Sequence, residues 1–255
     1  MWSWFRNWRR RRLLHRTRLP ESVWRSAQAA FPLLQRLSAS QQQRLRDLAV
    51  LFLHEKSIEG ARGFRLSDEM RLLLAMQACL PILGLDLDWY AGWVSVIVYP
   101  DRFVPERQDT DEAGVVHANR RVLSGEAWLH GPVILSWSDI AGTRRLDGDN
   151  VVIHEFAHKL DMRNGAVNGM PPLHRDMSPA EWSRAFSAAY ADFERRVQQG
   201  DELYGINPYA AESPAEFFAV LSEAFFEIAQ ALRALYPEVY RQMSLFYRQD
   251  PAAAV

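Results

Sequence analysis

The stretch Asn150–Asp161, NVVIHEFAHKLD, places two histidines four residues apart among apolar residues. The apolar pattern predicts a buried helix that ends near Gly165. Residues four apart lie on one face of a helix, so His154 and His158 can direct two imidazoles at one metal ion. Glu155 can then act as general base toward a metal-bound water. This H-E-x-x-H pattern is typical of metalloproteases.

The alternative for this stretch is a helix with two core histidines and a surface glutamate. Unpaired polar groups are costly to bury, which favours a metal over this alternative. A catalytic zinc takes three protein ligands, so the motif needs a third. His174, Glu212, Glu216 and Glu223 are candidates, and the apolar residues around Glu216 and Glu223 favour these two without separating them. Asp161 is better placed to accept a hydrogen bond from a ligand's other N–H group.

The periodicity around this motif predicts an α+β protein. Residues 20–88 show helical spacing, and residues 89–140 hold short runs rich in β-branched residues that indicate a small, mostly antiparallel sheet. Residues 141–251 carry the motif helix and further helices. We expect one domain over residues 20–251, followed by a frayed tail at 252–255.

The N-terminal segment, residues 1–19, has a composition of its own. Residues 1–18 hold seven arginines and no acid, together with the aromatic residues Trp2, Trp4, Phe5 and Trp8. We interpret this segment as a flexible, solvated arm. The alternative is an anchor that contacts an anionic membrane surface or an acidic partner.

Composition and charge exclude some classes of protein. The 30 basic residues nearly cancel the 31 acidic ones, which does not favour a general nucleic-acid-binding surface. The single cysteine, Cys79, rules out an internal disulfide and fits a reducing compartment. The sequence shows neither a signal peptide nor an apolar run long enough to span a membrane. We therefore expect a cytoplasmic protein.

Two motifs together carry a family resemblance. HEFAHKLD (154–161), followed by PYAAESPAEFFAVLSEAFFE (208–227), resembles the Mlc titration factor A family of bacterial zinc peptidases over residues 20–251. It is also similar to the catalytic core of anthrax lethal-factor-type metalloproteases. The resemblance implies a zincin-like fold of the gluzincin type with one Zn²⁺ per chain. The ligands that it implies are His154, His158 and Glu216.

The resemblance also implies roles for the residues around these ligands. Glu155 would be the general base, and the hydroxyl of Tyr209 would stabilise the oxyanion. Asp161 would lie behind the ligands and hold them through hydrogen bonds. Apart from the resemblance, Glu223 is a further candidate for such a position. An edge strand beside the motif helix would pair with the peptide substrate, and GWVSVIVYP (92–100) or GPVILSW (131–137) could supply it unless both are internal.

The predicted function is that of a zinc-dependent peptidase, with aminopeptidase-type activity implied by the resemblance. The family's reported partner is a DNA-binding repressor, Mlc, through which a member influences sugar uptake by the glucose phosphotransferase system. A similar repressor is the partner implied here. The alternative is a repressor-binding regulatory protein with little peptidase activity.

Overall fold

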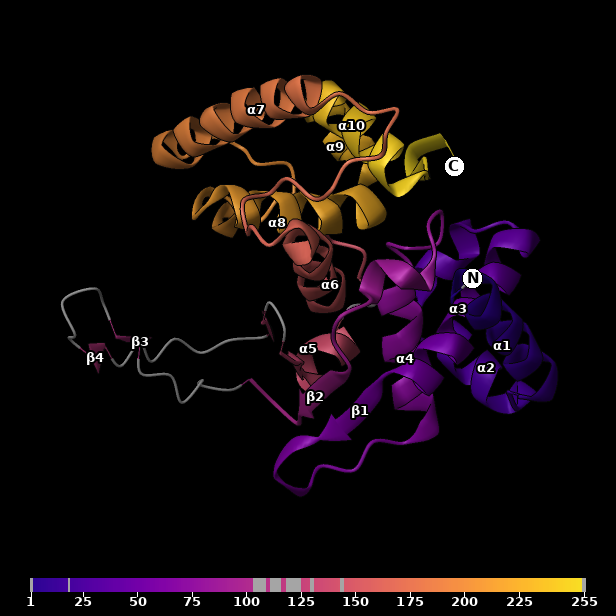
Figure 1. The fold of residues 1–255 in the computed structure, drawn as a ribbon. Coiled ribbons are helices and arrows are strands. Elements are labelled where there is room, and N and C mark those ends of the chain that lie inside the picture. The colour runs from indigo at the N-terminus through magenta and orange to yellow at the C-terminus, as the bar shows by residue number, and fades with distance from the viewer. Residues whose placement is uncertain are drawn as a thin grey trace.

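The computed structural model describes residues 2–17, 19–102, 109–110, 116–117, 125–128, 131–142 and 145–253. Helix α6 (Val151–Asp161) lies in the middle of the molecule, between the C-terminal helices and the small sheet (Figure 1). It contacts α8 on one side, strands β5 and β6 on another, and α4 toward the N-terminal helices. The expected α+β architecture is therefore confirmed, and the structure adds that the motif helix lies at its centre.

The N-terminal helices pack against one another through leucine-rich faces. They are α1 (Trp2–Arg16), α2 (Glu21–Ala29), α3 (Ala39–Glu55) and α4 (Asp68–Cys79). Ser38 caps α3 by accepting a hydrogen bond from the backbone N–H of Gln41, whose side chain binds back to the N–H of Ser38. Leu45, Leu72 and Leu74 are almost completely buried and belong to the same hydrophobic core as α6 and α8.

The sheet is mixed. Its strands are β1 (Ser57–Gly60), β2 (Ser95–Tyr99), β5 (Gly125–Ala127) and β6 (Val133–Ser136), in the order β1-β2-β6-β5. The pairs β1–β2 and β2–β6 are parallel, and only β5–β6 is antiparallel. A separate antiparallel pair joins β3 (Asp109–Thr110) to β4 (Val116–His117).

The expectation of a mostly antiparallel sheet is therefore wrong for the four-stranded sheet. Strand β1 lies inside the segment that was expected to be helical, and α4 connects it to β2. Parallel neighbouring strands need a crossover connection, and α4 supplies the one between β1 and β2. β2 and β6 are internal, and β5 is the edge strand next to α6. Neither of the two strands that were candidates for pairing with the substrate lies at an edge of this sheet.

The chain after the sheet is helical, as expected, but its first helix begins at Trp137, inside the segment 89–140 that was expected to be sheet. Its helices are α5 (Trp137–Gly142), α7 (Pro179–Gln199), α8 (Pro214–Glu227), α9 (Ala229–Leu235) and α10 (Pro237–Tyr247). Short 3₁₀ turns connect the elements at Pro32–Arg36, Ala61–Gly63, Leu87–Tyr90, Met162–Asn164, Pro208–Ala211 and Pro251–Ala253. The turn after α6 ends at Gly165, whose φ of 87° is left-handed, and this confirms the predicted stop.

Both chain ends differ from expectation. Residues 2–16 form helix α1, and Arg10 pairs with Glu55 and Asp88, so this segment is docked on α3. Ala252 is buried and its N–H donates to the hydroxyl of Tyr240, so the predicted tail is wrong for residues 252–253, and residues 254–255 lie outside the described residues. The single domain over residues 20–251 stays a prediction. None of the helices described here is both long and apolar enough to cross a bilayer.

Candidate metal centre

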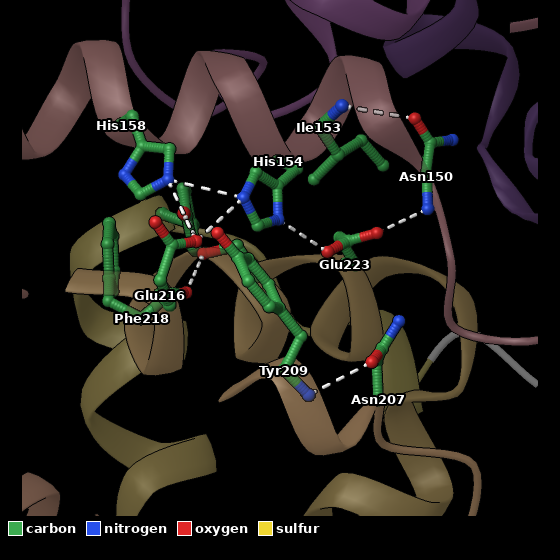
Figure 2. A network of polar contacts seen from close by, with 11 residues as sticks. Asn150, Ile153, His154, His158, Asn207, Tyr209, Glu216, Phe218 and Glu223 are labelled. Carbon is green, nitrogen blue, oxygen red and sulfur yellow. Dashed lines mark hydrogen bonds and ion pairs between the residues drawn. The ribbon is translucent and has the colours of Figure 1, made fainter. Parts of the chain in front are cut away.

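Helices α6 and α8 cross so that three potential metal ligands converge (Figure 2). His154 Nε2 lies 3.0 Å from Glu216 Oε2 and 3.2 Å from His158 Nε2. His158 Nε2 lies 3.3 Å from the same oxygen of Glu216. Within the described part of the chain, these three residues are the one group of histidine, cysteine and acidic side chains close enough to share an ion.

The triangle formed by the three donor atoms has the size of a metal site. Bonds of about 2.0–2.1 Å in a tetrahedral site place neighbouring ligand atoms roughly 3.3 Å apart. The three sides of 3.0, 3.2 and 3.3 Å come close to this spacing. Two imidazole nitrogens and one carboxylate oxygen also form a donor set common in metalloenzymes. The residues present therefore fit a metal ion.

Local sequence explains why the ligands point to the same place. Asn150 caps α6 by accepting a hydrogen bond from the N–H of Ile153 at 3.0 Å, which puts His154 in the first turn. Ser213 caps α8 by accepting from the N–H of Glu216 at 3.2 Å, with Pro214 at the first helical position. Glu216 therefore lies at the open start of α8, while the rest of this helix is buried.

Glu223, two turns along α8, holds the back of the His154 ring. Its Oε1 lies 2.8 Å from His154 Nδ1, and its Oε2 accepts the backbone N–H of Asn150 (Figure 2). Glu227 continues this network by accepting from the side chain of Asn150 at 2.9 Å and from the N–H of Gly148 at 3.1 Å. A carboxylate on Nδ1 fixes the ring orientation and leaves Nε2 directed at the ion site.

The carboxylates and imidazoles of the site shift one another's pKa values. Burial would lower the pKa of His154, but hydrogen bonds to Glu216 and Glu223 raise it well above its usual value. Burial would raise the pKa of Glu216, but hydrogen bonds from His154 and His158 bring it well below its usual value. The carboxylates thus favour a protonated His154 ring, and a metal ion bound at Nε2 would compete with that proton.

Glu155 lies beside the ligands and under the edge strand. Burial raises the pKa of this carboxyl to about 7, although His154 and His158 lower it. Among the described residues its Oε2 has no hydrogen-bond partner. Gly125 of β5 approaches so closely that a Cβ there would stand 2.5 Å from Glu155 Oε1. A buried carboxylate with a free oxygen and a pKa near neutrality is suited to accept a proton.

The site opens into a cleft of about 740 Å³. Tyr209, in the 3₁₀ turn before α8, is 43% exposed and lines this cleft. Its ring centroid is 6.2 Å from that of His154, and its hydroxyl points toward His154 and Glu216 in Figure 2. The side chain of Asn207 accepts the N–H of Tyr209 at 3.0 Å and so fixes this turn. The other charged residues along the cleft include Arg102, Glu126 and Asp149.

Three other residues singled out in the sequence lie outside the converging group. Asp161 accepts the N–H of Gly169 at 2.8 Å, and its role behind the ligands stays a prediction. His174 Nε2 lies 2.8 Å from the carbonyl oxygen of Phe246 and is a packing residue. Glu212 is outside the converging group.

Sequence reasoning missed three residues that shape the site: Asn150, Lys159 and Gly125. The buried Lys159 ammonium donates to the carbonyl oxygens of Trp128 and Gly131, and so ties the connection between β5 and β6 to α6. An asparagine directly before a helical pattern is a capping signal, and a glycine in a strand can mark close backbone approach. These two signals could have predicted the roles of Asn150 and Gly125. No comparable signal indicated that Lys159, inside an apolar helix, would bind the connection between β5 and β6.

Comparison with known proteins agrees with this geometry. Proteins named Mlc titration factor A are similar over most of their length: that of Salmonella schwarzengrund is 41% identical over 233 residues, covering 90% of this chain and 86% of the relative. That of Cronobacter sakazakii is 38% identical over 251 residues, covering 98% and 92%. A family described as glucose-regulated metallo-peptidase M90 matches residues 5–248, which includes most of the arginine-rich segment that was expected to lie outside the resemblance. The chain therefore belongs to the glucose-regulated metallo-peptidase M90 family.

Proposed function

We propose that the chain is a zinc-dependent peptidase of the gluzincin type, with one Zn²⁺ held by His154, His158 and Glu216. The observation that carries this proposal is the triangle of donor atoms, whose sides fit three corners of a zinc tetrahedron. When bound, the ion would supply a water of lowered pKa and polarise the scissile carbonyl. The chain's own residues supply the rest of the chemistry.

Glu155 is the general base in this proposal. Its Oε2 has no hydrogen-bond partner among the described residues, and its pKa is raised. Both support this role, because a base near neutrality can take a proton from water and pass it to the leaving amine. The hydroxyl of Tyr209 donates a hydrogen bond to the oxyanion. The position of Tyr209 at the cleft and the direction of its hydroxyl in Figure 2 support this role. Glu223 keeps the His154 ring oriented through the bond to Nδ1.

The substrate in this proposal is a peptide that adds to the edge of the sheet. Strand β5 is the edge strand, and its residues Gly125 and Ala127 line the cleft. An extended backbone paired there would pass directly over Glu155. We further propose aminopeptidase-type action, since the exposed Asp149 on the cleft wall offers a negative charge to a protonated α-amine.

The test compares the zinc-loaded wild type with Glu155→Gln on amino-acid anilides. Removal of the base lowers kcat by about 10²–10⁴-fold while the zinc content stays at that of the wild type. Glu202→Gln, at an exposed glutamate away from the cleft, is the matched control and keeps full activity. Full activity in Glu155→Gln would refute the mechanism. Equal rates on anilides with free and acetylated α-amines would refute the aminopeptidase assignment and leave the zinc-peptidase mechanism standing.

A second function is favoured by the relatives' name. Proteins called Mlc titration factor A are named for an effect on Mlc, and two of them align with 86% and 92% of their own lengths here. We propose that this chain also binds a DNA-binding repressor of that type, in the cytoplasm where such a repressor works. Co-purification of a repressor from extract by both wild type and Glu155→Gln supports this role, and recovery of none contradicts it.

A further inference from the structure

Helix α1 exposes a face on which aromatic rings alternate with arginines. Trp4, Phe5 and Trp8 are 72%, 55% and 44% exposed. The rings of Phe5 and Trp8 stack with centroids 5.9 Å apart, and the guanidinium of Arg12 lies 5.4 Å from the Trp8 centroid. Large aromatic residues are mostly buried in folded chains, so three on one exposed helix face indicate a surface that meets a partner.

The opposite face of α1 is already used for docking. The guanidinium of Arg10 binds Glu55 at 2.7 Å and Asp88 at 2.8 Å, and Arg6 also pairs with Asp88. Leu13 and Leu14 pack against the hydrophobic core. Because these residues fix the rotation of the helix about its axis, the aromatic face is held outward. It is not needed to attach the helix to the protein.

The outward face is strongly basic. Its arginines are Arg9, Arg11, Arg12 and Arg16, and all four are exposed. Helix α1 contains no acidic residue, and the structure describes no ion pair for these four. The whole chain carries a formal net charge of −1, so attraction to an anionic surface would have to come from this patch and not from overall charge.

We propose that this face of α1 binds the surface of an anionic lipid bilayer. A helix that combines tryptophan and phenylalanine with arginine suits the interface, where rings enter the headgroup layer and guanidinium groups meet lipid phosphates. Single-stranded nucleic acid needs free ring faces for base stacking, whereas Phe5 and Trp8 already stack on each other and Arg12 covers Trp8. The composition and the packing of the rings therefore favour lipid.

Binding through this face leaves the metal centre accessible. Helix α1 lies at the edge of the molecule beside α3, whereas α6 and α8 lie on the other side of α4 (Figure 1). The residues that line the catalytic cleft come from β5, α6, α8, the segments next to these elements, and Arg102 after β2, and none comes from α1. Membrane attachment and peptide hydrolysis can thus occur in the same molecule, and each can be measured without the other.

The experiment is co-sedimentation of the intact chain with vesicles of phosphatidylcholine alone, or with phosphatidylglycerol at a ratio of about two to one. The chain is expected to bind only the anionic vesicles, and binding falls as salt is added. Each arginine at an anionic surface contributes about a fivefold gain in partitioning, so replacing Arg9, Arg11, Arg12 and Arg16 by glutamine lowers binding by roughly several hundredfold.

A matched variant separates local from global charge. Replacing the exposed Arg65, Arg145, Arg184 and Arg233 by glutamine changes net charge by the same amount away from α1, and this variant keeps its binding. Replacing Trp4, Phe5 and Trp8 by serine removes the insertion of rings and weakens binding while the arginines remain. Circular dichroism and metal content show that each variant is folded.

Three results would overturn the proposal. The wild type could fail to bind anionic vesicles, or the α1 variant and the matched variant could lose binding equally. Binding to single-stranded DNA or to polyglutamate in the absence of any binding to vesicles would assign the face to an acidic macromolecule instead of a membrane.

Discussion

Gly125→Ala is the substitution that tests most directly how the edge strand and the proposed base depend on each other. A Cβ at this position would stand 2.5 Å from Oε1, 2.6 Å from Cγ and 2.8 Å from Cδ of Glu155. Non-bonded carbons settle at about 3.5–4.0 Å, so either the glutamate or the strand has to move by about 1 Å. Glu155 is only 5% exposed, so the open space toward which its carboxylate could shift is the cleft that it lines.

The expected result is a large loss of activity with a small loss of stability. A displacement of about 1 Å in a catalytic group can lower the rate by about 100-fold. Overpacking of this kind costs about 1–3 kcal/mol of the free energy of unfolding, which leaves the chain folded. None of the three proposed ligands comes from β5, so zinc content is expected to match that of the wild type.

The assay is kcat/KM on an amino-acid anilide, together with urea unfolding and zinc analysis of the same samples. Gly142→Ala is the control, because a Cβ there meets no atom within 4 Å. It is expected to retain wild-type activity. A Gly125→Ala enzyme within about twofold of the wild type would refute the reasoning, since a loss of about 100-fold is expected from a 1 Å shift.

Two further substitutions test the charges around the ligands. Glu223→Gln removes the carboxylate that holds His154 Nδ1, and zinc affinity is expected to fall about 10–100-fold in competition with a chelator; unchanged affinity would contradict the role of Glu223. In metal-free protein, burial raises the pKa of Glu155 from 4.5 to about 7, so the folded state keeps a proton that the unfolded state loses first. Stability is therefore lost as pH rises from the unfolded pKa through about 7, by on the order of 3 kcal/mol. Glu155→Gln should escape this loss, and equal pH dependence of the two proteins in urea unfolding with chelator would disprove it.

Much of the site follows from local sequence. The apolar spacing around NVVIHEFAHKLD specifies a buried helix, and helical geometry alone puts His154 and His158 on one face. Ser213 with Pro214 specifies the start of α8 in the same local way, because a capping hydroxyl and a proline at the first position need only a few neighbouring residues. Such signals survive in the sequence because the interactions that produce them span four residues or fewer.

Elements held by distant contacts were harder to predict. Strand β1 has four residues between two helices, and only its pairing with β2 across α4 makes it a strand. Helix α1 is rich in arginine and gives no core-facing stripe, and its position depends on Glu55 and Asp88 far along the chain. Both elements lack a strong local pattern, so propensity could not reveal them.

The third ligand shows most clearly where sequence ends and tertiary structure begins. The residues by themselves determined a two-histidine helix with a neighbouring glutamate, and a later helix with Glu216 and Glu223 on one face. They could not separate these two glutamates, because residues seven apart on a helix share that face. The crossing of α8 over α6 separates them: Glu216 reaches Nε2 of His154, and Glu223 reaches Nδ1 of the same ring. The two nitrogens point in opposite directions, so one glutamate faces the ion site and the other supports the ring from behind.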